Sequence, residues 1–343
     1  MEAKVLSKKD LPKFLDDLRK DHELVGPKKK GKNFVFDYIE DDSELQLDYP
    51  TTSLPPKKVY FPPEEDLYEY KKDGNDVVIK DLTEKWARKR ALLGVHPCDI
   101  KALQCLDKVF GDEYKDPAYL ERRKMSIVIG MTCSDASPQC FCVAAESGPD
   151  AESGYDLLMT DIGTSYYFKS GSEAGNELLA ASYFKDAEAA DTKKRDAAVQ
   201  RVAKKMPQGL NPSKVKSLME EKVNDKLWDE YSKKCVLCGA CNFVCPTCHC
   251  FTIVNEPNLT RTEGKMKRTW DACHFKNFAK IAGEGNFRGE REARVKHRLY
   301  DKLHHSQDMY GDVFCVGCGR CIVACPASID IREVVQKVAG VKK

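Results

Sequence analysis

The amino-acid sequence predicts an α+β protein in two parts, a mixed α/β domain over residues 1–212 and a helical domain over residues 213–343. Between residues 76 and 168, short apolar runs alternate with glycine, proline and aspartate, which is typical of strands mixed with a few helices. Residues 184–233 are rich in lysine, glutamate and alanine, which indicates exposed helices leading to a boundary. From residue 235 onwards, two cysteine-rich loops enclose a helical middle. A length of 343 residues also suits two domains.

Residues 1–60 are polar and interrupted by prolines, which break helices, so we expect an irregular lead-in. The runs DVVIKDL, ALLGV, MSIVIGM, DLLMTDIG and SYYF then predict strands. A short helix is expected around Ile331–Val338. The last helix before the first cysteine loop should pack on the helical domain through apolar side chains, which are Leu218, Val223, Leu227, Trp228 and Tyr231.

The composition excludes several classes of protein. The 56 Lys and Arg residues nearly cancel the 54 Asp and Glu residues, so no overall field draws the chain to nucleic acid or to a membrane surface. The first residues, MEAKVLSKKD, lack an apolar signal region, and no stretch approaches the roughly 18 apolar residues of a spanning helix. We therefore expect a cytoplasmic protein without membrane insertion. In that reducing compartment, the sixteen cysteines favour metal ligation over disulfides.

The cysteine spacing reveals an internal repeat, because CVLCGACNFVCP and CVGCGRCIVACP both spell CxxCxxCxxxCP. Three closely spaced thiolates can wrap one face of a 4Fe-4S cubane while backbone N–H groups of the loop donate to its sulfurs. In two-cluster ferredoxins, the fourth cysteine of each run ligates the other cluster. Two 4Fe-4S clusters are therefore predicted. The ligands of the first are Cys235, Cys238, Cys241 and Cys325, and those of the second are Cys315, Cys318, Cys321 and Cys245.

Zinc is the main alternative, because paired Cys-x-x-Cys motifs also build zinc ribbons. A zinc site needs four thiolates and gains nothing from two runs of four that each end in proline. The first motif also contains Cys241, Cys245 and Cys248 at the CxxxCxxC spacing of radical enzymes that use S-adenosylmethionine. The repeat argues against that interpretation, since the second copy has no counterpart of Cys248.

From about Pro55 to Glu333, the chain resembles the beta subunits of soluble sulfhydrogenases and the A subunits of anaerobic sulfite reductases. The resemblance rests on PPKKVYFPPEE, GVHPCDIKALQCLDKVF, CFCVAAESGPDAESGYDLLMTDIG, CNFVCPTCHCF, WDAC, GNFR and CVGCGRCIVACP. It implies an α/β half, a helical dicluster ferredoxin half, and a relay of electrons. The partners that it implies are a flavin subunit that meets a nicotinamide, NAD(P), and a separate catalytic subunit.

Four more cysteines fall in the N-terminal part, namely Cys98, Cys133, Cys140 and Cys142. A Cys-x-Cys pair with two more distant thiolates can hold a cubane, so a third 4Fe-4S cluster is predicted there. Buried apolar thiols and structural zinc are the alternatives. Cys105, on the helical stretch after Cys98, departs from the family pattern and is expected to be a core thiol.

A second Cys-x-Cys, formed by Cys248 and Cys250, is followed by Cys273 and supplies three thiolates for a fourth cluster. Carboxylate and imidazole can replace thiolate on iron. The remaining candidates are a partner's side chain and three side chains of this chain, Asp271, His249 and His274. Asp271 is our first choice, because it lies two residues from Cys273. Its alternative role is a helix N-cap, and His249 stands where relatives often carry an aromatic residue.

A basic helix is expected between the two motifs, with six cationic residues, Arg288, Arg291, Arg294, Lys296, Arg298 and Lys302. Such a helix near anionic clusters would raise their potentials and could steer an acidic partner. The alternative is a solvated face balanced by nearby carboxylates, and this alternative is the expectation for each single residue. Nucleic-acid binding is not expected, because the stretch lacks a recognisable module.

The sequence lacks a GxGxxG after a predicted strand, a Walker loop and a defensible Ser/His/Asp arrangement. We therefore expect a non-catalytic subunit that relays single electrons between a flavin- and NAD(P)-linked subunit and a catalytic subunit, such as a hydrogenase or sulfite reductase. The alternative function is a reductase of a small sulfur compound at the incompletely cysteine-ligated cluster of Cys248, Cys250 and Cys273. A structural adaptor stabilised by zinc is a third interpretation.

Overall fold

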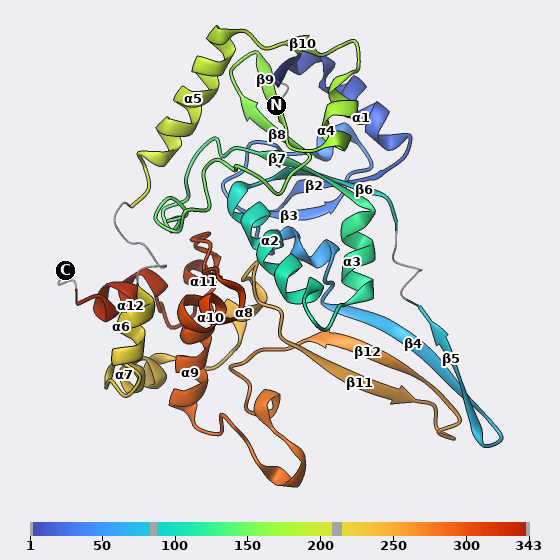
Figure 1. The fold of residues 1–343 in the computed structure, drawn as a ribbon, viewed down its shortest axis with the longest axis vertical. Helices are drawn as coiled ribbons and strands as arrows, with labels where there is room; N and C mark the ends of the chain where they lie inside the picture. Colours follow the sequence, from blue (N-terminus) through green and yellow to red (C-terminus); the bar gives the residue numbers. More distant parts are fainter. Residues whose placement is uncertain (1–2, 83–87, 208–214, 341–343) are drawn as a thin grey trace.

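The computed structural model describes residues 3–82, 88–207 and 215–340. It combines an eight-stranded mixed sheet, a four-stranded antiparallel sheet and a helical region that carries the cysteine motifs (Figure 1). This arrangement confirms the predicted α+β class. Within the described ranges, every helix is too short or too polar to traverse a lipid bilayer.

The large sheet has the strand order β10-β1-β9-β8-β7-β6-β2-β3. Its centre is parallel, from β2 through β6 and β7 to β8, and the outer strands pair antiparallel. The strands are β1 (Ala3–Ser7), β2 (Glu23–Lys30), β3 (Asn33–Tyr38), β6 (Arg90–Val95), β7 (Ser126–Met131), β8 (Leu157–Asp161), β9 (Ser165–Ser170) and β10 (Lys185–Asp186). All residues of β6 are buried, as expected of a parallel strand covered on both faces.

Alternate residues of the central strands enter two cores, one on each face of the sheet. Leu93 and Ile129 pack with α1 (Leu11–Arg19) and α4 (Glu173–Leu179). Leu92 packs on the opposite face with α2 (Pro97–Gly111) and α3 (Pro117–Lys124). Since a fully buried leucine contributes roughly 1.5–3 kcal/mol, these two layers fix the sheet that positions α2 and its cysteines.

The prediction of an irregular lead-in over residues 1–60 was wrong. This segment contains β1, α1, β2 and β3, with 3-10 turns at Lys8–Asp10, Asp42–Glu44 and Pro56–Val59. Two apolar residues of β2, Leu24 and Val25, are buried on opposite faces, and β1 fills the gap between β9 and β10. Strand pairing with distant segments therefore overrides the polar composition.

The small sheet joins two segments that lie far apart in the chain. Its order is β11-β12-β4-β5, formed by Phe251–Pro257, Glu263–Trp270, Glu64–Asp73 and Asp76–Asp81. It extends away from the rest of the molecule as an arm (Figure 1). At its base, Glu65 is buried between the guanidinium groups of Arg122 and Arg268. The strands β11 and β12 were not expected in the helical part, and the predicted boundary at 212/213 falls in residues 208–214, outside the described residues.

The helical region packs around a hydrophobic core of its own, which contains Trp228 and Leu299. Its helices, with the one before them, are α5 (Ala189–Ala203), α6 (Lys216–Glu221), α7 (Leu227–Lys234), α8 (Ala240–Phe243), α9 (Arg291–Tyr300), α10 (Ser306–Tyr310), α11 (Arg320–Val323) and α12 (Ile331–Val338). A π turn at Asp301–His305 connects α9 and α10, and 3-10 turns lie at Lys276–Ala279 and Ala282–Glu284. The prediction of α12 is confirmed, whereas that of a buried Val223 was wrong, since its side chain is 42% exposed.

Candidate metal centres

The two cysteine motifs fold into nearly identical loops. Gly239 and Gly319 both have φ of +74°, a left-handed conformation that disfavours any side chain, and each precedes a four-residue helix. A Cβ at Gly319 would lie 2.6 Å from the carbonyl oxygen of Gln139, which leaves no space for one. Within these loops, backbone N–H groups donate to sulfur, from Leu237 to Cys235 at 3.4 Å and from Ile329 to Cys325 at 3.3 Å. Such N–H groups are the donors that an iron–sulfur cluster needs.

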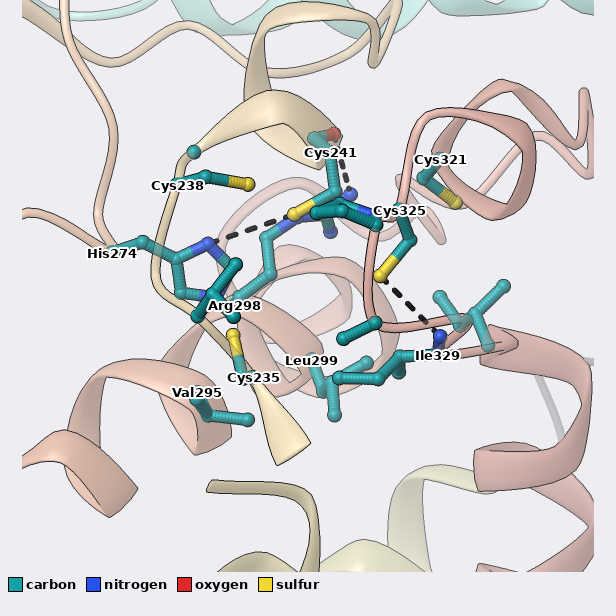
Figure 2. Close-up of a pocket in the computed structure, with 15 residues that line it drawn as sticks. Cys235, Cys238, Cys241, His274, Val295, Arg298, Leu299, Cys321, Cys325 and Ile329 are labelled. Carbon is teal, nitrogen blue, oxygen red and sulfur yellow. Dashed lines mark hydrogen bonds between the residues drawn. The ribbon is translucent and has the colours of Figure 1, made fainter. Parts of the chain in front are cut away.

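The first predicted ligand set lines a single cavity of about 70 Å³, shown in Figure 2. The set comes from both motifs and consists of Cys235, Cys238, Cys241 and Cys325, and Cys321 of the second set lines the same cavity. Apolar side chains such as Leu299 and Ile329 close the cavity, and the Nδ1 atom of His274 lies 3.5 Å from the sulfur of Cys241. The structure thus brings three cysteines of the first motif and the last cysteine of the second motif to the same cavity.

The second predicted set lines another, smaller cavity of about 20 Å³, with Phe141 and Phe314 in its wall. Its cysteines are Cys245, Cys315, Cys318 and Cys321. Burial raises the pKa of Cys315 to about 11 and the pKa of Cys318 to about 12. Free thiolates are therefore disfavoured in this cavity, and a metal centre would supply the positive charge that keeps them ionised.

The third predicted set gathers in one cluster with Val202 and Met206 of the N-terminal part. Its cysteines are Cys98, Cys133, Cys140 and Cys142. The loop that carries Cys142 packs directly against the second motif, because the N–H of Phe141 donates to the carbonyl oxygen of Gly317 at 2.8 Å. The hydroxyl of Ser147 also donates to the carbonyl oxygen of Val316 at 2.6 Å. The second and third cysteine sets are therefore neighbours.

Two of the three cysteines of the proposed fourth set lie beside the buried amide of Asn242, which the sequence did not single out. Its Nδ2 atom donates to Cys273 at 3.0 Å and lies 3.9 Å from Cys248. A hydrogen bond with Cys273 raises the pKa of Cys250, so these two thiols are also adjacent. In the sequence, the only signal for this role was an asparagine directly after a motif cysteine, Cys241.

The three candidates for its remaining ligand lie in different surroundings. The carboxylate of Asp271 accepts hydrogen bonds from Thr252 Oγ1 at 2.5 Å and from the N–H of Ala272 at 2.7 Å. His249 is half-buried, with its Nδ1 atom 3.1 Å from the carbonyl oxygen of Thr247 and its ring 6.3 Å from that of Phe314. His274 lies at the first cavity instead (Figure 2).

The spacing of the thiols tests the zinc alternative. Tetrahedral zinc with bonds of about 2.3 Å requires sulfurs about 3.8 Å apart. Among the residues that the structure describes, no three cysteines place their sulfurs within 4.8 Å of one another. The spacing of the thiols therefore does not match a tetrahedral zinc site, whereas a cubane, being larger than one ion, takes cysteines that are farther apart.

Buried cations lie between the sets. Arg298 lines both the first and the second cavity, and its Nε and Nη1 atoms are buried without a hydrogen-bond partner in the described part of the chain. These N–H groups are available as donors to cluster sulfurs. Arg320, next to the second and third sets, forms a bidentate pair with Asp99 at 2.6 and 2.7 Å. The electrostatic environment is therefore positive where anionic clusters would lie.

The expectation of a solvated basic helix was wrong for three of its six cations. Arg294, Arg298 and Lys302 are buried. The ammonium of Lys302 donates to the carbonyl oxygen of Thr247 at 3.2 Å, and that of the buried Lys57 donates to the carbonyl oxygen of Cys248 at 2.7 Å. Lys302 also pairs with Asp301 at 2.9 Å, so a carboxylate and backbone carbonyl groups, rather than solvent, surround these charges at the cysteine-rich region. The prediction of Cys105 as a core thiol is confirmed, since its side chain is fully buried.

Comparison with known proteins agrees with this geometry. Residues 234–329 match a family model described as a 4Fe-4S dicluster domain. Over 330 residues, which are 95% of both chains, the sequence is 31% identical to the sulfhydrogenase 2 subunit beta of Pyrococcus furiosus. The match covers the large sheet and the arm as well as the motifs. The chain therefore belongs to the family of sulfhydrogenase beta subunits and is an iron–sulfur protein.

Proposed function

We propose that the protein is a subunit that carries single electrons through a continuous series of 4Fe-4S clusters. The observation that supports this proposal is the contiguity of the cysteine sets. Cys321 and Arg298 line both the first and second cavities, and the third set adjoins the second through Phe141 and Gly317. A hydrogen bond between Cys245 and Cys248 connects the second set with the fourth. Each set thus has another as its immediate neighbour.

The proposed ligands of the clusters are those that the spacing predicts. In this assignment, the first two clusters take the crossed motif cysteines, the third takes Cys98, Cys133, Cys140 and Cys142, and the fourth takes Cys248, Cys250, Cys273 and Asp271. A bound 4Fe-4S cluster supplies one-electron redox chemistry. The protein supplies N–H donors from Asn242, Arg298 and the loop backbone, and a low-dielectric surrounding that sets the potentials.

Electrons would leave or enter at the first set, because Cys238 is exposed. The neighbouring Val236 is 58% exposed and lines the same cavity, so an apolar contact surface lies beside that ligand. We assign the partners as a flavin- and NAD(P)-binding subunit and a catalytic subunit of a cytoplasmic complex. The relative's name, sulfhydrogenase 2 subunit beta, supports membership of a multisubunit enzyme.

The division into two domains, residues 1–212 and 213–343, is likewise proposed. The pairing of β4 with β12 connects these two parts of the chain.

The test is anaerobic purification of the complex followed by iron and sulfide analysis and EPR spectroscopy during reduction by NAD(P)H. Twelve or more irons per chain, reduced only when the flavin subunit is present and reoxidised through the catalytic subunit, would support the relay. Fewer than eight irons per chain would contradict even the two clusters of the motifs.

A second function has one specific observation in its favour. The proposed fourth set has three cysteines, and the carboxylate of Asp271, its proposed further ligand, already accepts two hydrogen bonds. If iron keeps an open position there, a small sulfur compound could bind and be reduced. Reduction of such a compound by the isolated chain with an artificial electron donor would support this second function. Strict dependence on the other subunits would exclude it.

A further inference from the structure

Three of the seven histidines, His297, His304 and His305, line the same cavity. Two of them, His304 and His305, approach Asp308 so that one ligand atom from each lies within 4.8 Å of the others. The Nδ1 atoms of His304 and His305 are 3.3 Å apart, and His304 Nδ1 is 3.2 Å from the Oδ2 atom of Asp308. Within the described ranges, no other group of three His, Cys, Asp or Glu residues is this compact.

The local helix geometry explains why adjacent histidines converge. His304 and His305 end the π turn at Asp301–His305, which widens the helix and reduces the rotation from one residue to the next. Asp308 follows His304 by four residues and therefore lies on the same face of the helix. Single π turns inside α-helices occur frequently at functional sites.

The hydrogen bonds of His304 orient it as a metal ligand. Its Nε2 atom lies 3.1 Å from Oε1 of Glu220 on α6, and because a carboxylate only accepts, Nε2 is the donor. In the neutral ring, Nδ1 then carries the free lone pair, which faces His305 and Asp308. A histidine that donates its second N–H to a carboxylate is the usual arrangement around protein-bound transition metals.

From this geometry we propose that His304, His305 and Asp308 form a binding site for one divalent transition-metal ion of the zinc class, with Glu220 as the positioning residue. For bonds of about 2.0–2.1 Å, tetrahedral geometry places ligand atoms about 3.3 Å apart, close to the separations of 3.2 and 3.3 Å found here. Imidazole and carboxylate ligands suit zinc, nickel and cobalt. Water completes the coordination from a cavity of about 470 Å³ that both histidines line.

The competing occupant is a proton. An imidazolium at His304 would donate to both Glu220 and Asp308 without any metal. Nearby cations oppose both occupants, and a divalent ion more strongly than a proton, since Lys216 pairs with Asp308, and Arg288 and Lys296 line the same cavity. Lys216 pairs with Oδ1 of Asp308, whereas the proposed ligand atom is Oδ2, so metal binding has to overcome the repulsion of that ammonium but does not have to displace it.

Zinc binding to the anaerobically purified protein, after removal of loosely bound metal, tests the site. Competition with a chromophoric zinc indicator should show one zinc per chain beyond any bound to the iron–sulfur centres. His305→Ala should weaken that binding about 100-fold, and Glu220→Gln should weaken it by about 10-fold. His297→Ala is the matched control. The ring of His297 lies 6.0 Å from that of His305 and lines the same cavity, but His297 is not one of the three proposed ligands.

Zinc K-edge X-ray absorption separates this site from the cysteines. The expected spectrum has only nitrogen and oxygen neighbours with histidine scattering, and the iron content stays unchanged. A sulfur shell, equal affinity in the wild type and His305→Ala, or an equal loss in His297→Ala would overturn the proposal. Because the iron count is measured independently, failure here leaves the electron-transfer proposal standing.

Discussion

Arg298 donates through Nη2 to the carbonyl oxygen of Cys241 at 3.3 Å, while its Nε and Nη1 atoms are buried without a partner in the described structure (Figure 2). The guanidinium thus lies at the wall shared by the two motif cavities. Burying charged N–H groups without hydrogen-bond partners costs free energy. Two anionic clusters that accept hydrogen bonds from these groups would offset that cost.

Replacing Arg298 with Met should lower the midpoint potentials of both motif clusters. The cation favours the reduced form, which carries one more negative charge, so its removal makes reduction harder. At an effective dielectric constant of ~20, a unit charge about 8 Å away contributes roughly 2 kcal/mol, which corresponds to about 90 mV for one electron. A redox titration followed by EPR measures the shift.

Lys296→Met is the control for that variant, because it removes one positive charge from the same helix at a less buried position. The ammonium of Lys296 donates to the carbonyl oxygen of Val223, where solvent and salt screen it. Its removal should move the potentials by less than about 20 mV. Unchanged potentials in Arg298→Met with full iron content would contradict the role of Arg298.

Cys98 and Cys105 lie on the same helix, α2, and offer a matched pair for the third cluster. Cys98 gathers with the three cysteines of the 133–142 loop, whereas Cys105 is fully buried outside that group. Cys98→Ala should remove the irons of one cubane, and Cys105→Ala should leave the iron content unchanged. Iron and sulfide analysis of the two variants checks this. Equal iron content in both would exclude Cys98 as a ligand.

The sequence predicted those features that depend on short spacing. Two repeated motifs, and the helix from Ile331 to Val338, involve residues that are close along the chain, so periodicity and spacing suffice to find them. The family resemblance was also readable, because it rests on continuous segments.

The features that the sequence did not reveal depend on contacts between distant residues. The pairing of β4 with β12 joins Tyr68 to Met266, and nothing local indicates it. The burial of Arg298 and Lys302 was missed for a similar reason. A charged residue is normally exposed, and only the groups around these two residues compensate for the loss of solvent. Asn242 was missed because asparagine is common in loops and its amide meets Cys273 only in three dimensions.

The buried triad at the base of the arm predicts a large loss of stability when its acid is removed. Glu65 is 3% exposed and accepts from Arg122 and Arg268. Glu65→Gln leaves two buried guanidinium groups with too little negative charge, which should lower the free energy of unfolding by about 3–5 kcal/mol. Anaerobic urea unfolding followed by tryptophan fluorescence measures the change.

The adjacent Glu64 supplies the control for the triad. Its side chain is 62% exposed and pairs with Lys267 at 3.1 Å on the surface of the arm. Glu64→Gln should cost no more than about 1 kcal/mol. If both variants unfold at the same urea concentration, the triad does not anchor the arm.

Gly319 and Gly311 separate backbone strain from steric contact at the second cysteine motif. Both have positive φ, +74° and +69°, so an alanine at either position costs about 1–2 kcal/mol of conformational strain. Nothing lies within 4 Å of a Cβ at Gly311, whereas at Gly319 it would lie 2.6 Å from the carbonyl oxygen of Gln139. Only Gly319→Ala should therefore push the loop of Cys140 away from the second motif.

We accordingly expect Gly311→Ala to lower the melting temperature slightly and keep all its iron. Gly319→Ala should lower the melting temperature further and lose iron, because the loop between Gln139 and Cys142 carries two of the third set's cysteines and packs on Gly317 of the second motif. Thermal unfolding and iron analysis of both variants provide the comparison. Equal melting temperatures with full iron in both would show that the contact between the two cysteine loops is dispensable for cluster binding.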